Sequence, residues 1–276
     1  METTMLLASR AANTLLRLFP RSFVRDVGGF QVEGNTRDLI QRYLYMFGIW
    51  EPATTSWIER SLQPGDTFVD VGANIGYFSL LAARKVGLAG SVVSIEASPS
   101  IFESLQSHLV RNQAFNVRAL NAAASSELGS LQVFRAPDDN LGATTTVDYG
   151  EPGYVLEAEV EAAPLHELLT PEEAANARII KVDVEGAEWD VVQGLLPLLG
   201  GRPDLEVIVE MQGDELADGR IIRAFADAGF HCYSVVNDYA VSTYVARESA
   251  RPIRLEGRLL LDQADLIFSR TDAALL

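Results

Sequence analysis

Polar residues suited to ligand binding and proton transfer stand at the ends of five short runs in this 276-residue chain. They are Asp70, Glu96, Asn121, Asp183 and Glu210. The runs before them are mostly apolar and β-branched, which predicts buried strands. Ligands of open α/β sheets bind outside the carboxyl ends of the parallel strands. A carboxylate there can accept the hydroxyls of a ribose, or orient a substrate hydroxyl and take its proton. We therefore expect the five side chains to lie along one edge of a sheet.

The most informative stretch begins with the apolar run 67–71. It continues through the small-residue turn Gly72-Ala-Asn-Ile-Gly76, a predicted helix at 77–84 and a second apolar run at 91–95. This order predicts a strand–turn–helix–strand unit of about 30 residues, which is typical of a nucleotide-binding parallel sheet. Small residues in the turn let the backbone approach a ligand and present N–H groups at the N-terminus of the helix.

This turn differs from the dinucleotide-binding pattern G-x-G-x-x-G. Counted from Gly72, the other two glycines would fall on Asn74 and Tyr77. Asn is the non-glycine residue that best tolerates left-handed backbone. Asp70 would repel a pyrophosphate but would attract a ligand that carries an ammonium and a sulfonium. Glu96 is placed to accept both hydroxyls of a ribose. An NAD-dependent oxidoreductase on a Rossmann-like sheet is therefore only an alternative.

The rest of the chain predicts one doubly wound α/β domain over residues 1–276, without an internal repeat or linker. Residues 1–62 are expected to form a helical lid, and residues 63–276 the core. A small antiparallel β insertion is expected at 129–163, with a mobile loop at 137–153. Further strands of the main sheet are expected at 116–124, 179–184, 205–210, 231–236 and 265–269.

Composition excludes several classes of partner. The net charge is −16, which disfavours nucleic acid because phosphates need a basic surface. Cys232 is the single cysteine, so an internal disulfide and a cysteine zinc cluster are excluded, and a cytoplasmic location is expected. No apolar run reaches transmembrane length. Arg10 and Arg17 interrupt the apolar stretch 5–19, which is interpreted as a helix packed on the domain or covering the site.

Acids near the end of the fourth parallel strand are the candidates for chemistry. Asp183 and Glu185 are predicted to be catalytic, because a carboxylate there can orient an acceptor hydroxyl and accept its proton late in group transfer. A favourable charge in the first turn of a helix explains Glu188 better, and Glu185 equally well. Convergence of Asp183, Glu185, Glu210 and Asp214 leaves metal assistance as an alternative. The acidic pattern of metal-dependent catechol-type enzymes is not apparent, so no metal is predicted.

Several stretches together resemble the FkbM family of S-adenosyl-L-methionine (SAM)-dependent methyltransferases. They are F-V-D-V-G-A-N-I-G-Y-F-S (68–79), S-I-E-A-S-P (94–99), N-A-A (121–123), I-K-V-D-V-E-G-A-E (180–188) and the preceding G-I-W-E-P (48–52). The resemblance implies a Rossmann-like class I methyltransferase fold, with a mostly parallel seven-stranded sheet and an antiparallel edge strand. It also implies SAM as cofactor. Better-known members O-methylate hydroxyls of polyketide macrolides or sugars, so the expected partner is a small-molecule hydroxyl acceptor.

The resemblance also assigns roles to single residues. The expected SAM-binding set is Asp70, Gly72, Ala73, Asn74, Gly76, Glu96, Ala97, Ser98, Asn121 and Ala122. The expected acceptor set is Glu51 from the W-E-P turn, Tyr43 and Trp50 from the aromatic-rich lid, and Glu210 from the fifth strand end. Packing in the core would explain Tyr43 or Trp50 equally well. Acceptor specificity is expected in residues 1–35, in 137–153 and after 240. A homo-oligomer and a non-catalytic SAM-binding scaffold both stay open.

Overall fold

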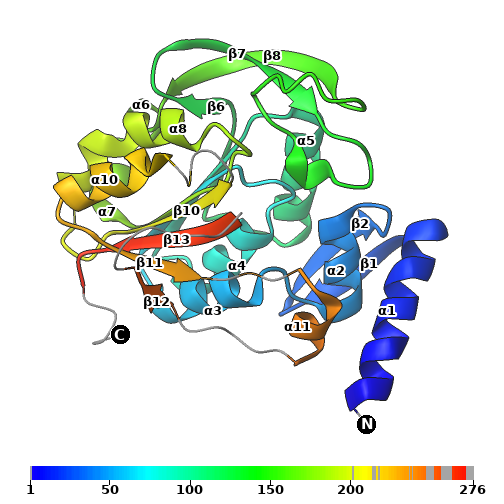
Figure 1. Cartoon of the computed structure of the whole chain (residues 1–276). Coiled ribbons are helices and arrows are strands. Elements are labelled where there is room, and N and C mark those ends of the chain that lie inside the picture. Colours follow the sequence, from blue (N-terminus) through cyan, green and yellow to red (C-terminus); the bar gives the residue numbers. More distant parts are fainter. Residues whose placement is uncertain are drawn as a thin grey trace.

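A large β-sheet runs through the middle of the molecule in the strand order β12-β11-β13-β10-β9-β3-β4-β5 (Figure 1). The structure, a computed structural model, describes residues 2–200, 202–212, 216, 218–235, 237, 239–246, 252–255 and 263–271. Five strands are parallel: β3 (Thr67–Val71), β4 (Ser91–Glu96), β5 (Val117–Asn121), β9 (Ala177–Val182) and β10 (Glu206–Gln212). Most of their side chains are buried, because helices cover both faces of the sheet.

The chain reverses its direction of travel across the sheet at β3. It runs outward through β4 to β5 and then returns to β9, on the opposite side of β3. The carboxyl ends of β3 and β9 therefore flank the point where the strand order switches, which is where open α/β sheets form ligand crevices. The predicted doubly wound α/β sheet is confirmed.

The antiparallel part of the sheet is larger than expected. β13 (Gln263–Ser269) is antiparallel to both β10 and β11 (His231–Val235), so it is an internal strand. The two-residue strand β12 (Ile253–Arg254) pairs antiparallel with β11 and forms the edge. The described part of the sheet thus has eight strands instead of seven. A run of two residues carries no periodic signal, which is why the sequence did not indicate β12.

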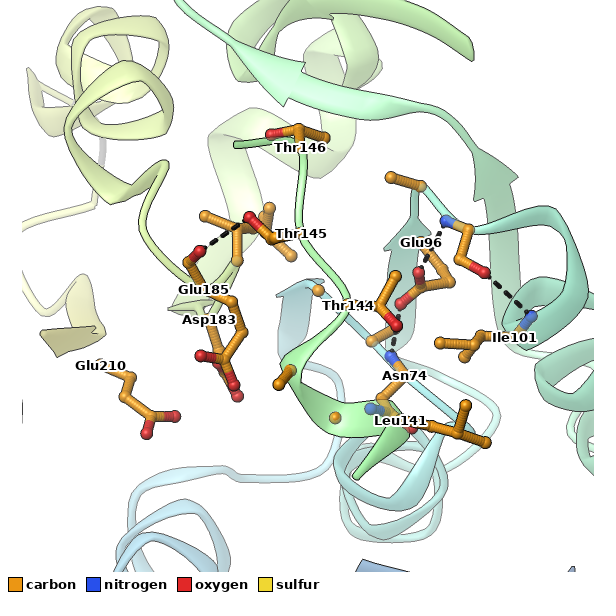
Figure 2. A pocket seen from close by; sticks show the side chains of 18 of the residues that line it. Asn74, Glu96, Ile101, Leu141, Thr144, Thr145, Thr146, Asp183, Glu185 and Glu210 are labelled. Carbon is orange, nitrogen blue, oxygen red and sulfur yellow. Dashed lines mark hydrogen bonds between the residues drawn. The ribbon is translucent and has the colours of Figure 1, made fainter. Parts of the chain in front are cut away.

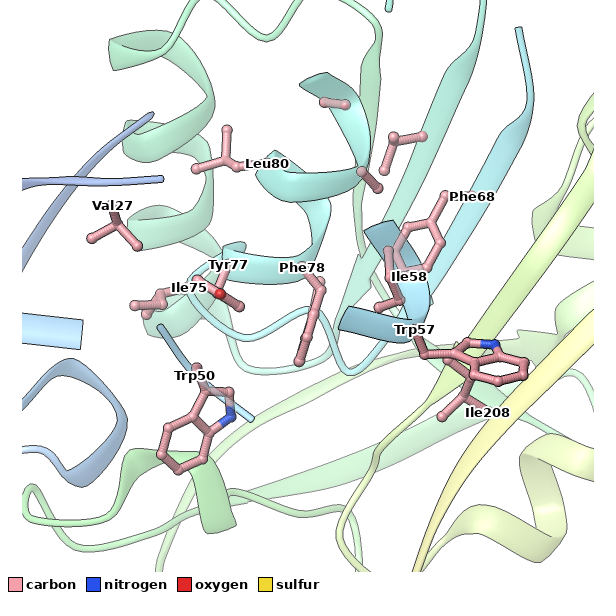
Figure 3. Close-up of a cluster of buried hydrophobic side chains, with 14 of the residues drawn as sticks. Val27, Trp50, Trp57, Ile58, Phe68, Ile75, Tyr77, Phe78, Leu80 and Ile208 are labelled. Carbon is pink, nitrogen blue, oxygen red and sulfur yellow. The ribbon is translucent and has the colours of Figure 1, made fainter. Parts of the chain in front are cut away.

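Alternate residues of each strand contribute side chains to two apolar clusters, one on each face of the sheet. Phe68 points into the cluster that contains Ile58 of α3 (Pro52–Ser61) and Leu80 of α4 (Tyr77–Val86) (Figure 3). Val69 points into the other cluster, with Val191 of α8 (Glu188–Leu195) and Phe225 of α10 (Arg220–Asp227). The period of two along β3 therefore places a helical layer on each side.

The N-terminal residues do not form one continuous lid. The helix α1 (Glu2–Leu18) packs on α2 (Leu39–Phe47) and α11 (Val241–Ala246), at the periphery of the molecule (Figure 1). The hairpin of β1 (Ser22–Val27) and β2 (Phe30–Asn35) lies against α5 (Pro99–Arg111), where His108 bonds to Glu33. Among the described helices, none combines the length and apolar character needed to cross a bilayer.

A second, three-stranded sheet stands beside the main one. Its order is β6-β8-β7, from β6 (Ala123–Ser125), β7 (Gly129–Arg135) and β8 (Val155–Pro164). The β7–β8 pair is antiparallel, as the alternating pattern predicted, whereas β6 and β8 are parallel. Short helices α6 (Leu165–Leu168) and α7 (Pro171–Asn176) lead from β8 into β9.

The loop between β7 and β8 is tied to two other parts of the chain. Backbone N–H groups of Leu39 and Leu141 bond to the Asp139 carbonyl (3.0 Å) and to the Asp38 carboxylate (2.9 Å). The Thr145 hydroxyl donates to the Glu185 carbonyl (2.8 Å). The 137–153 segment, expected to be mobile, is therefore held between α2 and the turn after β9. A short 3₁₀ helix, Leu141–Ala143, lies within it.

The contact between α8 and the small sheet gives a test of the packing. A Cβ at Gly194 would lie 2.1 Å from the Ser125 carbonyl oxygen and 3.0 Å from Pro164 Cα, both backbone atoms. Gly194→Ala is expected to lower the free energy of unfolding by about 1–3 kcal/mol through overpacking. The gain of about 1 kcal/mol in helix propensity offsets part of this loss. Urea denaturation measures the change. Gly129→Ala, which meets nothing within 4 Å, is the control, and equal midpoints for the two variants would contradict the prediction.

Candidate active site

The turn after β3 brings two strand-end segments into close contact. Gly72, Asn74 and Gly76 have positive φ of 79°, 50° and 89°. A Cβ at Gly72 would lie 1.7 Å from the Asp183 carbonyl oxygen, so only glycine permits this approach. The Asp183 N–H also donates to the Val71 carbonyl (3.0 Å). The turn and the end of β9 therefore form one continuous rim.

Glu96 closes one end of the site. Its buried carboxylate accepts the backbone N–H groups of Asn74 and Ser98, both at 2.8 Å (Figure 2). Burial raises the pKa of Glu96 to about 7, although the two backbone N–H groups act in the opposite direction. The carboxylate thus fixes the turn after β3 against the end of β4.

The opposite end of the site is acidic, with a single lysine. The buried Lys181 ammonium lies 2.7 Å from Asp183 Oδ2 and over the Phe78 ring, 4.9 Å from its centroid. One carboxylate oxygen each from Glu51, Asp183 and Glu210 lie within 4.8 Å of one another. Burial lowers the pKa of Lys181, but Asp183, Glu51 and other nearby carboxylates outweigh it, so the pKa is raised overall.

Two more groups complete this acidic end. The Tyr239 hydroxyl donates to Glu51 Oε1 (3.2 Å), and the Tyr239 ring stacks on Trp50 with centroids 5.1 Å apart. Burial and neighbouring carboxylates raise the pKa of Glu51 and of Glu210 well above the ordinary value. Burial and the neighbouring carboxylates therefore both disfavour the charged forms of Glu51 and Glu210.

A cavity of about 940 Å³ connects the two ends. The turn after β3 and the ends of β4 and β9 form its floor. The β7–β8 loop crosses it between the Glu96 end and the Asp183–Glu185 end (Figure 2). Its lining includes Leu39, Ile40, Ile101, Leu141, Thr144, Thr145, Thr146 and Tyr149. This volume lies within the range of small-molecule sites, about 300–1,000 Å³.

Most of the residues expected from the sequence line this one cavity. They are Trp50, Glu51, Gly72, Ala73, Asn74, Glu96, Ala97, Ser98, Ala122, Asp183, Glu185 and Glu210. Four expected residues lie outside the lining: Tyr43, Asp70, Gly76 and Asn121. Asp214 lies outside the described residues.

Asp70 lies beneath the turn instead of in the cavity. It is 1% exposed, and its Oδ2 accepts the Ser79 hydroxyl at 2.5 Å. Ser79 in turn accepts the Ser94 hydroxyl (2.7 Å). Burial raises the pKa of Asp70, and Lys181 acts against this rise. The expected direct contact of Asp70 with a ligand is therefore corrected to an indirect position that joins β3, β4 and α4.

The other three residues outside the lining, Asn121, Gly76 and Tyr43, have structural roles. Asn121 Nδ2 donates to the carbonyls of Glu96 and Ala97, at 2.8 and 2.9 Å, and so fixes the end of β4. Gly76 begins α4 in a left-handed conformation. The Tyr43 hydroxyl donates to the Tyr239 carbonyl (2.7 Å), behind Trp50. Tyr43 therefore supports the cavity wall from the core, which corrects its expected contact with the acceptor.

The two glutamates after β9, Glu185 and Glu188, differ in backbone geometry and in hydrogen bonding. Glu185 has φ 58°, and its carbonyl accepts hydroxyls from the β7–β8 loop. The Glu188 carboxylate accepts the backbone N–H groups of Val184 and Gly186, within 3.2 Å. Glu188 thus has the local role expected of an acid in the first turn of a helix, while Glu185 faces the cavity.

Sequence reasoning missed Lys181 and Tyr239. Lys181 did leave a signal, since a charged residue inside an apolar parallel strand needs a buried partner. Tyr239 left none, because its position depends on contacts between distant parts of the chain.

The sequence pattern described as the Methyltransferase FkbM domain matches residues 70–232. The chain belongs to the FkbM methyltransferase family. It is 30% identical over 151 residues to Methyltransferase 1 of Beauveria bassiana, covering 48% of this chain and 59% of that protein. It is 25% identical over 217 residues to 31-O-demethyl-FK506 methyltransferase FkbM of Streptomyces tacrolimicus, covering 69% of this chain and 82% of that protein.

The fold agrees with this assignment. A SAM-dependent methyltransferase from Agrobacterium tumefaciens superposes with a TM-score of 0.51 at 9% identity, over 91% of this chain and 70% of that one. The fold is thus that of class I methyltransferases, and fold and family together make SAM the cofactor, as predicted. The glycine cradle at Gly72 and the carboxylate of Glu96 fit that cofactor. Nothing in the comparisons supports an NAD-dependent oxidoreductase.

The raised pKa of Glu96 predicts how SAM binding depends on pH. Ribose hydroxyls donate to the ionised carboxylate, so affinity is expected to be full above pH 7 and to fall by up to about tenfold per pH unit below it. Calorimetric titrations with SAM between about pH 5.5 and 8 measure this. Glu96→Gln should bind weakly at every pH, and Glu103→Gln on the exposed face of α5 should keep the original profile. A flat profile for the intact protein would contradict the prediction.

Proposed function

We propose that the protein is a SAM-dependent O-methyltransferase that acts on a hydroxyl of a small-molecule natural product or a sugar. The observation that carries the proposal is that one cavity has Glu96, a carboxylate placed to accept ribose hydroxyls, at one end. At its other end lie carboxylates that can accept a hydrogen bond from a substrate hydroxyl. The related Streptomyces protein, a 31-O-demethyl-FK506 methyltransferase by name, supports transfer to oxygen.

In this proposal the Glu96 end holds the nucleoside. Glu96 accepts the ribose hydroxyls, and the small side chains of Ala97 and Ala122 leave space for a flat base beside Ile101. Gly72 and Ala73 bring backbone close to the cofactor without a bulky side chain between them.

Asp183 is the proposed group for the acceptor. Lys181 Nζ lies 2.7 Å from Asp183 Oδ2 and so fixes the Asp183 side chain in the wall of the cavity. SAM supplies a methyl group on a sulfonium. The acceptor hydroxyl donates to Asp183 Oδ1, which aligns the oxygen and receives its proton as the new C–O bond forms and the C–S bond breaks. S-adenosyl-L-homocysteine and the methyl ether are the products.

The acceptor would enter between aromatic rings and the β7–β8 loop. The stacked pair Trp50 and Tyr239 offers a flat apolar surface, while Thr144, Thr146 and Tyr149 offer polar groups on the facing wall. A wall of this mixed character suits an oxygen-rich molecule with an apolar ring. It supports the expectation that residues 137–153 determine acceptor choice.

The proposed function is tested in two stages. Calorimetry should first show binding of SAM and S-adenosylhomocysteine to the intact protein. Incubation with SAM labelled in its methyl group and a panel of macrolide, polyketide and sugar hydroxyl acceptors should then give a labelled ether, identified by mass spectrometry. Methylation of a nitrogen or a carbon, or absence of SAM binding, would overturn the proposal.

Asp183→Asn is expected to lower the rate of methyl transfer by about 10²–10⁴-fold, because the amide orients the hydroxyl without accepting its proton. SAM affinity should change only a few-fold, since Asp183 lies away from the ribose end. Single-turnover rates and SAM titrations separate the two effects. Asp190→Asn, at an exposed position of α8, is the matched control. A variant that loses SAM binding and rate in equal measure would contradict the assigned role.

A further inference from the structure

The acidic end of the cavity brings together three carboxylates from distant parts of the chain. Glu51 comes from the turn before α3, Asp183 from the end of β9 and Glu210 from β10. One oxygen from each lies within 4.8 Å of the other two. Like charges this close repel one another unless something neutralises them.

One oxygen of this cluster is unsatisfied. Glu51 is 2% exposed, and its Oε2 has no hydrogen-bond partner among the described residues. Its Oε1 accepts the Tyr239 hydroxyl (3.2 Å), which fixes the carboxyl group toward the cavity. The Glu51 backbone is held in a left-handed conformation, φ 40°, that non-glycine residues rarely adopt. A buried polar atom without a partner is costly, and a ligand at this position would remove the cost.

The charges of the cluster indicate what kind of ligand would fit. Three carboxylates and the Lys181 ammonium sum to about −2 when all are ionised. Lys181 is committed to Asp183 Oδ2 at 2.7 Å and to the face of Phe78. Lys181 alone therefore leaves the three carboxylates with an excess of negative charge. One divalent cation would bring the set to neutrality.

We propose that Glu51, Asp183 and Glu210 bind one divalent cation of the oxygen-preferring class, Mg²⁺, Mn²⁺ or Ca²⁺, at the acceptor end of the cavity. Oxygen ligands alone favour these cations over softer ones. Lys181 and Tyr239 orient the ligating carboxylates from behind, as second partners of metal ligands commonly do. The sequence led to the expectation of no metal because the acidic pattern of catechol-type enzymes is not apparent, and the metal alternative considered there did not include Glu51.

The role of the cation rests on the proposed function. Three protein ligands leave coordination positions open on the cavity side, where Mg²⁺ and Ca²⁺ accept further oxygen atoms. An acceptor with two neighbouring oxygens, such as a diol or a hydroxy-ketone, would occupy them. The cation would thus select acceptors by oxygen spacing and would hold the reacting hydroxyl beside Asp183.

Calorimetry on the full chain, stripped with EDTA and then titrated separately with MgCl₂, MnCl₂ and CaCl₂, tests the site without any turnover. One cation per chain is expected, with a Kd between about 10⁻⁶ and 10⁻³ M. Glu51→Gln and Glu210→Gln should each weaken binding at least about tenfold, because each removes a charged ligand. Glu159→Gln, at an exposed position of β8, should bind as the intact protein does. Circular dichroism checks that both cluster variants remain folded.

The opposite results are equally clear. Absence of binding by all three salts, or equal affinity in Glu51→Gln, Glu210→Gln and Glu159→Gln, would overturn the cation site. A SAM titration in the presence of EDTA separates this failure from failure of the proposed function. SAM binding without cation binding would reject the cation alone, whereas cation binding without methyl transfer to any oxygen acceptor would reject the proposed function alone.

Discussion

The site depends on a single buried ammonium. Lys181 is the penultimate residue of β9, where every strand residue is buried, and it is paired with Asp183, which directly follows the strand. Removing one partner of a buried ion pair costs about 3–5 kcal/mol, because the other charge is left uncompensated. Four further carboxyl groups come within electrostatic range: Glu51, Asp70, Glu210 and Asp265. Lys181 thus offsets part of the negative charge of this acidic region in the interior of the sheet.

The two ends of the cavity are built by different means. At the Glu96 end, backbone N–H groups of the turn after β3 and of the start of α5 satisfy the carboxylate. That end is built from segments close together in the sequence, which satisfy the Glu96 carboxylate without help from distant parts of the chain. At the Asp183 end, the groups come from the turn before α3, from β9, from β10 and from Tyr239. In the proposed function, this division places cofactor recognition on local elements and acceptor recognition on long-range packing.

The sequence predicted best what depends on neighbouring residues. The strand–turn–helix–strand unit and the carboxylates that follow the strands carry local signals of period and residue type, and the structure places Glu96, Asp183 and Glu210 around one cavity. The sequence predicted less well how deeply each side chain is buried. Asp70 follows the same pattern as Glu96, yet the Ser79 and Ser94 hydroxyls enclose it below the turn. Tyr43 and Trp50 share an aromatic-rich segment, but only Trp50 reaches the cavity.

The β7–β8 loop shows why acceptor recognition is hard to predict from sequence. Its composition indicates a polar surface loop, and no periodic pattern fixes its path. Its position comes from hydrogen bonds to the cap of α2 and to the Glu185 carbonyl. Glu185 can accept those bonds because its left-handed backbone turns the carbonyl toward the loop. The conformation of the turn after β9 therefore holds both the proposed catalytic group and the wall facing it. A change of acceptor can thus arise in the loop while the strand ends below it stay the same.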